Sequence, residues 1–202
     1  MTIAENYLDC LQKAYKRSGH SEQWRHFEQI RQGASAEDFK DLQARFPDVP
    51  PSLLALLEYA DGTYFKEYAG EKVCLYFLGS DLDDYHYPYY LLSAREMAES
   101  HKVSAYYADY INRVFDPEDV LIDAQIIDRA DELDWLHFSD CMNNGGTSQL
   151  FIDFSPSAQG TKGQIVCTLH DPDEIYVLAA SFDDYLQMLI DQQCAFVEEE
   201  EK

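Results

Sequence analysis

His137, Asp140 and Cys141 are the residues whose types come nearest to a catalytic constellation. They combine an imidazole base, a carboxylate and a thiol nucleophile, the groups from which covalent catalysis is built. Successive side chains of a strand point to opposite faces, so this spacing does not indicate that the three groups meet. The sequence also lacks the Gly-x-Ser-x-Gly turn that exposes a catalytic serine. We therefore expect no catalytic residue; an enzyme would need a deep pocket that holds His137, Cys141 or Asp153.

Two further segments carry ligand-like side chains. His170-Asp171-x-Asp173 offers an imidazole and two carboxylates to a metal ion, but acidic turns of this kind are usually only solvated. Gly145-Gly146-Thr147-Ser148 is rich enough in glycine to cradle a phosphate, yet no lysine follows it and no helix begins there. A hairpin turn explains this glycine segment better. The sequence predicts neither a metal nor a cofactor.

Charge is the strongest signal in the composition. Asp and Glu number 38 against 15 Lys and Arg, which gives a net charge of −23, and residues 35–202 carry all of this excess. Nucleic acids and anionic membranes are excluded as partners, because binding to either depends on Lys and Arg. A basic protein partner would instead be attracted. Ordinary solubility is the alternative explanation of the charge, and composition alone leaves it open.

The cysteines and the N-terminus bear on the compartment. Five cysteines are irregularly spaced without a Cys-x-x-Cys pair, which is typical of reduced thiols and not of a zinc knuckle. The first residues contain neither a basic region nor a long apolar stretch, and the longest apolar runs span about five residues. We expect a cytoplasmic protein without a secretory signal or a membrane span.

One segment, residues 79–90, combines many tyrosines with aspartates. Tyrosine is enriched in protein interfaces because it offers a rigid contact area with a polar tip. Neighbouring aspartates would pair with Lys or Arg of a partner. The alternative is that the tyrosines pack beneath a loop. The predicted partner-binding residues are Asp81, Asp83, Asp84, Tyr85, Tyr87 and Tyr89.

Hydrophobic periodicity and capping patterns define the elements that position these residues. Helices are expected to begin near Thr2, before Trp24, and at Ser35, Pro51, Ser93 and Ser181, the one from Ser93 running to about Phe115. Strands are expected at 73–78, 120–127, 133–138, 150–154, 164–169 and 175–179, with a loop at 79–88. Consecutive strands with short turns favour antiparallel pairing. This order predicts an α+β fold: a single, mostly antiparallel sheet with helices packed mainly on one face.

Three segments resemble the SUKH superfamily, which contains the yeast Smi/Knr-type cell-wall-assembly regulator and many bacterial immunity proteins. The first, residues 35–62, is similar to the opening helices of the family and their terminal glycine. The second, 135–154, is similar to its aromatic strand, glycine turn and strand ending in an acid, and the third, 163–186, to its closing strand and helix. The resemblance implies a Smi/Knr-like fold, divided here into an N-terminal helical extension (1–34), the SUKH-like domain (35–197) and an acidic tail (198–202).

The resemblance also implies a function. It suggests a non-catalytic immunity protein that neutralises a basic toxin domain, such as a nuclease, by stoichiometric binding. An alternative within the same superfamily is a regulatory scaffold that binds a cellular protein, as the yeast member does. An enzyme is the third class, and it depends on the pocket described above.

Overall fold

The computed structural model describes residues 1–82, 85–100, 108–116, 120–141, 148–169 and 173–198, with the backbone alone described at 81–82 and 85–86. The helices are α1 (Ile3–Arg17), α2 (Ser21–Ile30), α3 (Ala36–Arg45), α4 (Pro51–Tyr59), α5 (Ala94–Glu99), α7 (Ala108–Ile111) and α8 (Phe182–Asp191), with short 3-10 turns η1 (Ala130–Glu132) and η2 (Ala195–Val197). The strands are β1 (Tyr64–Tyr68), β2 (Glu71–Cys74), β3 (Leu78–Leu82), β4 (Tyr85–Leu91), β5 (Val120–Ile122), β6 (Trp135–Asp140), β7 (Gln149–Asp153), β8 (Gln164–Leu169) and β9 (Asp173–Ala179).

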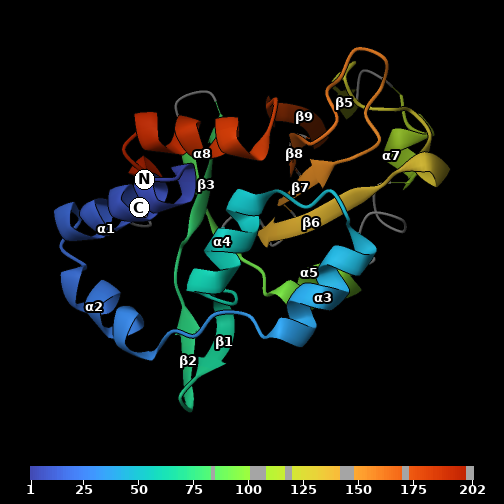
Figure 1. Cartoon of the computed structure of the whole chain (residues 1–202). Helices are drawn as coiled ribbons and strands as arrows, with labels where there is room; N and C mark the ends of the chain where they lie inside the picture. The colour runs from blue at the N-terminus through green and yellow to red at the C-terminus, as the bar shows by residue number, and fades with distance from the viewer. Residues whose placement is uncertain (83–84, 101–107, 117–119, 142–147, 170–172, 199–202) are drawn as a thin grey trace.

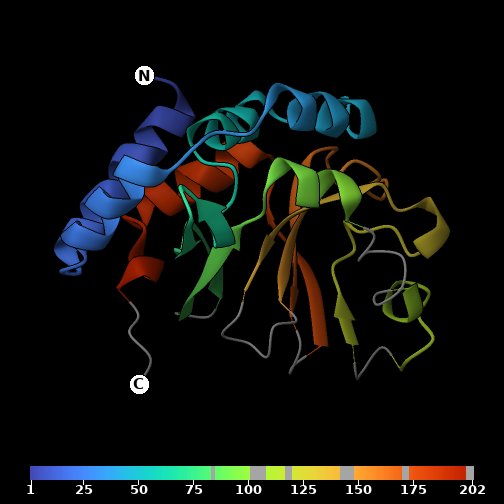
Figure 2. The same cartoon turned by 90° about the horizontal axis from the view of Figure 1, so that it is seen from below.

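Seven strands form one sheet in the order β3-β4-β6-β7-β8-β9-β5 (Figure 1). All neighbours in this sheet pair antiparallel except β5, which runs parallel to β9. Helices α1, α3, α4 and α8 lie along one side of the sheet, as the side view shows (Figure 2). The predicted α+β architecture is therefore confirmed. The small antiparallel sheet of β1 and β2 was not predicted.

Helix starts follow local chemistry. Thr2 and Ser93 each form a capping box, in which the hydroxyl accepts from the third helical N–H while Glu5 or Glu96 reaches back. Ser35 and Ser181 accept from the N–H three residues on. These short-range bonds satisfy amides that have no partner within the helix, and they explain why the predicted helix starts are confirmed.

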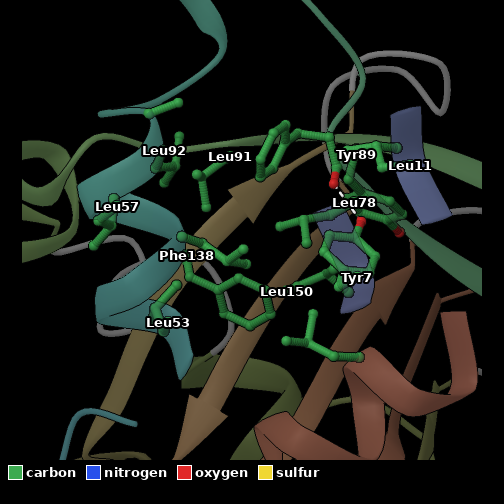
Figure 3. Packing of buried hydrophobic residues seen from close by; sticks show 14 of the residues in the cluster. Tyr7, Leu11, Leu53, Leu57, Leu78, Tyr89, Leu91, Leu92, Phe138 and Leu150 are labelled. Atoms are coloured by element: carbon green, nitrogen blue, oxygen red, sulfur yellow. Dashed lines mark hydrogen bonds between the residues drawn. The ribbon is translucent and has the colours of Figure 1, made fainter. Parts of the chain in front are cut away.

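The main hydrophobic cluster lies between the helices and the sheet (Figure 3). It unites Leu53 and Leu57 of α4 with Phe138 of β6 and Leu150 of β7. Helices α1 and α2, which belong to the predicted N-terminal extension, supply buried members of the same cluster, among them Tyr7, Leu11, Trp24 and Phe27. A smaller cluster, which includes Trp135, Phe151 and Val166, covers the opposite face of the sheet.

Several expected boundaries were wrong. Residues 79–88 were expected to be a loop, but β3 and β4 form a hairpin there, with Leu78 paired to Tyr89. The helix from Ser93 ends at Glu99, because Ser100 is extended and its hydroxyl contacts His137 of β6. The expected strand at 73–78 is divided between β2 and β3, and that at 120–127 ends at Ile122.

Two glycines occupy positions that only glycine adopts easily. Gly62 and Gly163 both have φ of +90°. At Gly62 an added Cβ would also lie 2.9 Å from the backbone nitrogen of Ser93, which is too close for any side chain. Both glycines therefore lie where the backbone turns tightly.

Candidate partner-binding face

Of the six predicted binding residues, the structure describes the side chains of Tyr87 and Tyr89. Asp83 and Asp84 lie outside the described part of the chain, and Asp81 and Tyr85 are described only as backbone of β3 and β4. Tyr89 is 0% exposed and belongs to the main core, where its hydroxyl lies 3.4 Å from the thiol of Cys167. Its ring is therefore inaccessible to a partner in this structure.

Tyr87 shares the helix-covered face of β4 with Tyr89, two residues away. It is half-buried and packs against the main cluster. The alternative reading of the sequence, in which tyrosines of this segment pack inward, therefore describes these two residues. Tyr90 is also buried, at 7% exposed, but its side chain lies on the opposite face, against the rings of Tyr64 and Tyr76.

On that opposite face Tyr90 lies at the centre of a stack of rings. Its centroid lies 4.9 Å from that of Tyr64 and 5.0 Å from that of Tyr76, and both contacts are tilted. Burial, together with hydrogen bonds from Cys74 and Tyr76, raises the pKa of Tyr90 well above its ordinary value. The phenol stays neutral and keeps its proton for hydrogen bonding.

Phe65 extends this stack into solvent. Its ring is 58% exposed and lies 4.9 Å from that of Tyr64. The pairing of β1 with β2 is irregular between Tyr64 and Lys66, and Phe65 between them has φ of +49°. Positive φ is unusual for a bulky residue, and a bulge of this kind re-aims a side chain. We call Tyr64, Phe65, Tyr76 and Tyr90 the tyrosine face.

A row of polar side chains continues from the tyrosine face across the sheet. Tyr90 pairs with Asp140, Asp140 with Gln149, and Gln149 with Thr168, so these side chains share one face of the sheet. Gln149 donates from Nε2 to Oδ1 of Asp140 at 3.0 Å. The row therefore joins the tyrosine face to a buried hydrogen-bond network.

His137 is at the centre of that network. The ladder between β6 and β7 shifts between His137 and Ser139, and this bulge places His137 and Asp140 on the same face. Nε2 of His137 lies 2.9 Å from Oδ1 of Asp140, and Nδ1 lies 3.0 Å from Oγ of Ser100. Spacing alone did not indicate this contact, because alternation along a regular strand places side chains three positions apart on opposite faces.

Ser100, His137 and Asp140 are the residue types of a hydrolase triad, but the histidine is buried within the fold. His137 is 2% exposed, both its ring nitrogens have hydrogen-bond partners, and its ring lies 5.0 Å from that of Phe151. At 2% exposure the imidazole lies beneath the surface, out of hydrogen-bond reach of a substrate in solvent. Cys141 is buried in the main cluster, on the other side of the sheet.

The remaining candidates from the sequence are the acidic segment 170–173 and the glycine segment 145–148. His170, Asp171 and Gly145-Gly146-Thr147 lie outside the described residues, while the carboxylate of Asp173 accepts from the hydroxyl of Tyr110 at 3.4 Å. Within the described ranges, no three His, Cys, Asp or Glu side chains gather closely enough to hold a metal ion. The helices in those ranges are also too short or too polar to cross a membrane.

Asp153 has a structural role at the end of β7. Its carboxylate is buried and accepts from Ser155 and from Nε2 of Gln164. Burial raises the pKa of Asp153 above its ordinary value, and the hydrogen bonds from Ser155 and Gln164 oppose this rise. The acid therefore fastens β7 to the start of β8.

Sequence reasoning missed the most exposed member of the tyrosine face. Tyr90 had a detectable signal, because recognition of a β-strand at 85–91 would have placed it opposite to Tyr87 and Tyr89. Phe65 had none, since its exposure follows from an irregular pairing with β2.

Two comparisons with known proteins complete the description. The family model of the SMI1 / KNR4 family (SUKH-1) matches residues 33–188, which is most of the chain and includes both sheets, helices α3, α4, α5 and α7, and most of α8. The search against curated proteins found no match to this chain.

Proposed function

Because the chain belongs to the SMI1 / KNR4 family (SUKH-1), a family that is generally non-enzymatic, we propose that it is an intracellular immunity protein that neutralises a basic toxin domain by stoichiometric binding. The burial of His137, which pairs with Asp140 and is 2% exposed, supports binding over turnover. The tyrosine face supplies the contact surface, and the net charge of −23 supplies long-range attraction.

The observation that carries this proposal is the exposure of Phe65 beside the ring of Tyr64, at the solvent end of the tyrosine face. A phenyl ring that is 58% exposed in a backbone conformation unfavourable to it gains nothing for the free fold. Strained residues persist where function uses them, and aromatic side chains dominate binding energy at interfaces. In a complex, Phe65 would fill a pocket of the partner, with Tyr64 and Tyr76 around it.

Charge determines how fast the partner arrives. A nuclease toxin must carry basic side chains to hold a phosphate backbone, so the acidic protein attracts it over about a Debye length. Such steering raises association rates by about 10–10³-fold and weakens as salt is added. The rings of the tyrosine face then slow dissociation, because most affinity differences between related complexes lie in the off-rate.

The experiment uses the purified full chain and the toxin domain encoded beside its gene. We expect one-to-one binding by calorimetry, loss of toxin activity at equimolar protein, and a slower association rate at high salt. Phe65→Ala should lower the affinity at least about tenfold. Phe115→Ala is the matched control, since Phe115 is a second exposed phenylalanine, 46% accessible, outside the tyrosine face.

Each outcome decides a different part of the proposal. Absence of binding to every adjacent toxin would overturn the immunity role, and capture of a basic cellular protein instead would favour the regulatory scaffold. If Phe115→Ala weakened binding and Phe65→Ala did not, the immunity role would stand, but the contact surface would not be the tyrosine face.

A further inference from the structure

Two cysteines from opposite ends of the chain meet at the surface of the helical layer. Cys10 belongs to α1, and Cys194 lies in the turn between α8 and η2. Their sulfur atoms are 3.3 Å apart, with the thiol of Cys194 donating to the sulfur of Cys10. No pattern in the sequence brings residues 184 positions apart together, so this pair is a product of the fold.

The packing of α1 against the C-terminal turn fixes this geometry. Arg17 donates from Nη2 to the carbonyl oxygen of Gln193 at 2.5 Å and from Nε to Glu198 at 3.1 Å. Gln193 and Cys194 both adopt left-handed backbone conformations, with φ of +56° and +52°. Two such residues in sequence are costly outside glycine, so the turn is held in a conformation that directs Cys194 at Cys10.

The two thiols differ in acidity and access. Cys10 is half-buried, whereas Cys194 is buried. The hydrogen bond from Cys194 lowers the pKa of Cys10 to about 7, and the charges of Arg17 and Lys13 act in the same direction against the effect of burial. A reagent in solution therefore meets a sulfur that is about half thiolate at neutral pH, with a second thiol directly behind it.

We propose that Cys10 and Cys194 are a redox modification site, at which a peroxide or a small-molecule disulfide converts the two thiols to a reversible disulfide. The bond would tie helix α1 to the C-terminal turn. A disulfide requires sulfurs about 2.05 Å apart, so the present separation must shorten by only about 1 Å.

The chemistry balances with hydrogen peroxide as oxidant. The thiolate of Cys10 attacks one peroxide oxygen, the O–O bond breaks, and the products are a sulfenic acid on Cys10 and hydroxide, which takes a proton to become water. The sulfur of Cys194 then attacks the sulfur of Cys10, the S–O bond breaks, and the departing hydroxide takes the Cys194 proton. Two thiols are oxidised, and one peroxide is reduced to two waters.

The other cysteines serve as internal references. Burial raises the pKa of Cys167 to about 12, so its thiol stays protonated and unreactive. Cys74 is exposed but lies on β2, in contact with Tyr90 and not with the N-terminal helix. If solvent access alone determined reactivity, Cys74 would be oxidised first, whereas we expect Cys10 to be oxidised first.

The test is a disulfide map of the native full-length protein. The chain is treated with hydrogen peroxide, free thiols are blocked with N-ethylmaleimide, and a Glu-specific protease, which cuts at Glu174 between Cys167 and Cys194, releases peptides for mass spectrometry. We expect a peptide pair joined through Cys10 and Cys194 that dithiothreitol separates. Cys10→Ser should abolish this pair, and the matched variant Cys74→Ser should leave it unchanged.

A second measurement on the reduced protein does not depend on disulfide formation. Cys194→Ser replaces a thiol donor with a hydroxyl and alters the environment that activates Cys10, so the rate of Cys10 alkylation by iodoacetamide at neutral pH should change at least about threefold. If Cys194→Ser does not fold, the map of the wild-type chain decides alone. Cys10 recovered as sulfinic acid, or joined to Cys74 or to a second copy of the chain, would overturn the proposal.

Discussion

His137 and Asp140 touch across a bulge in a single strand, with Nε2 of His137 2.9 Å from Oδ1 of Asp140. In a regular strand, side chains three positions apart point to opposite faces of the sheet. The shift in register between His137 and Ser139 turns the side chain of Asp140 to the same face of the sheet as that of His137. The contact is therefore a consequence of the bulge, and both partners depend on it for their buried hydrogen bonds.

Removal of the carboxylate at Asp140 should be costly for stability. In Asp140→Ala, Nε2 of His137 keeps its 3.2 Å contact to the carbonyl oxygen of Ser139 but loses the shorter one to the carboxylate, and Nε2 of Gln149 loses its 3.0 Å bond to the same group. Hydrogen bonds to a charged group contribute about 1.5–3 kcal/mol each. We expect the free energy of unfolding, measured by urea denaturation, to fall by at least about 2 kcal/mol. Asp140→Asn keeps one oxygen acceptor and should lose about half as much.

An exposed acid supplies the comparison for Asp140. Asp131 pairs with Arg129 at the surface, with both side chains more than half exposed. Asp131→Ala should change the free energy of unfolding by less than about 0.5 kcal/mol, as is usual at such positions. If Asp140→Ala were equally mild, the His137 network would have no stabilising role.

The same bulge shows where sequence reasoning ended. Caps at Thr2, Ser35 and Ser181 were predictable because each involves atoms within four residues of the helix start. The register of β6 against β7 depends on contacts between distant parts of the chain, and no local sequence pattern around His137 predicts a bulge. Consequently, the fold class was predictable while the contact between His137 and Asp140 was not.

The hairpin of β3 and β4 was missed for a related reason. Pro88, which has no N–H, and Gly79 lie opposite each other in its ladder, and both residues are typical of loops. Pro88 is tolerated because β4 pairs with β6 only at Tyr90 and Leu91. Without a predicted strand at 85–91, the side chains of Tyr87 and Tyr89 could not be assigned to one face and that of Tyr90 to the other.

Phe65 should be dispensable for folding. Glycine in a strand normally costs about 0.5–1 kcal/mol, but at a position with φ of +49° it also relieves backbone strain. We expect Phe65→Gly to lower the free energy of unfolding by no more than about 0.5 kcal/mol in urea denaturation. Toxin binding should nevertheless weaken, because the exposed ring is gone.

Glu67 of the same strand provides the control for that substitution. It is exposed like Phe65, and its φ is not positive. Glu67→Gly should therefore show the ordinary cost of about 1 kcal/mol without loss of binding. A larger destabilisation by Phe65→Gly than by Glu67→Gly would mean that the ring supports the fold and would remove the argument for a binding role.

The first 32 residues should be required for folding, although the family match begins at residue 33. Tyr7 is 0% exposed, and its hydroxyl donates to the carbonyl oxygen of Phe77 at 2.5 Å. A chain without residues 1–32 would expose this part of the core, so we expect it to lose its cooperative urea transition. Substitutions at Tyr7 should grade the effect: about 3–5 kcal/mol for Tyr7→Ala, and about 1–2 kcal/mol for Tyr7→Phe. A stable, cooperative truncated chain would show that α1 and α2 are an accessory layer.

The acidity of Cys10 should be visible in its reaction rate. Because the pKa of Cys10 in the fold is lowered to about 7, its alkylation by iodoacetamide should reach half of its maximal rate near that pH. In urea, where the chain is unfolded, the midpoint should move to about 8.5, the ordinary value for a cysteine. Rates followed by mass spectrometry of the peptide that contains Cys10 would measure both midpoints. Equal midpoints in the two states would show that the fold does not activate this thiol.

The same shift makes a prediction about stability. A group whose folded pKa lies below its unfolded pKa stabilises the fold once the pH exceeds the unfolded value, and this contribution is lost as the pH falls through the folded value. For Cys10 the window runs from about pH 8.5 down to about pH 7. The difference in free energy of unfolding between the wild type and Cys10→Ser should therefore increase in favour of the wild type from pH 6.5 to pH 8.5. Above that window Cys194 opposes the trend, since its hydrogen bond to Cys10 and its burial raise the pKa of Cys194, and the unfolded chain releases that proton first. A difference that is flat or that decreases across the window would contradict the lowered pKa of Cys10.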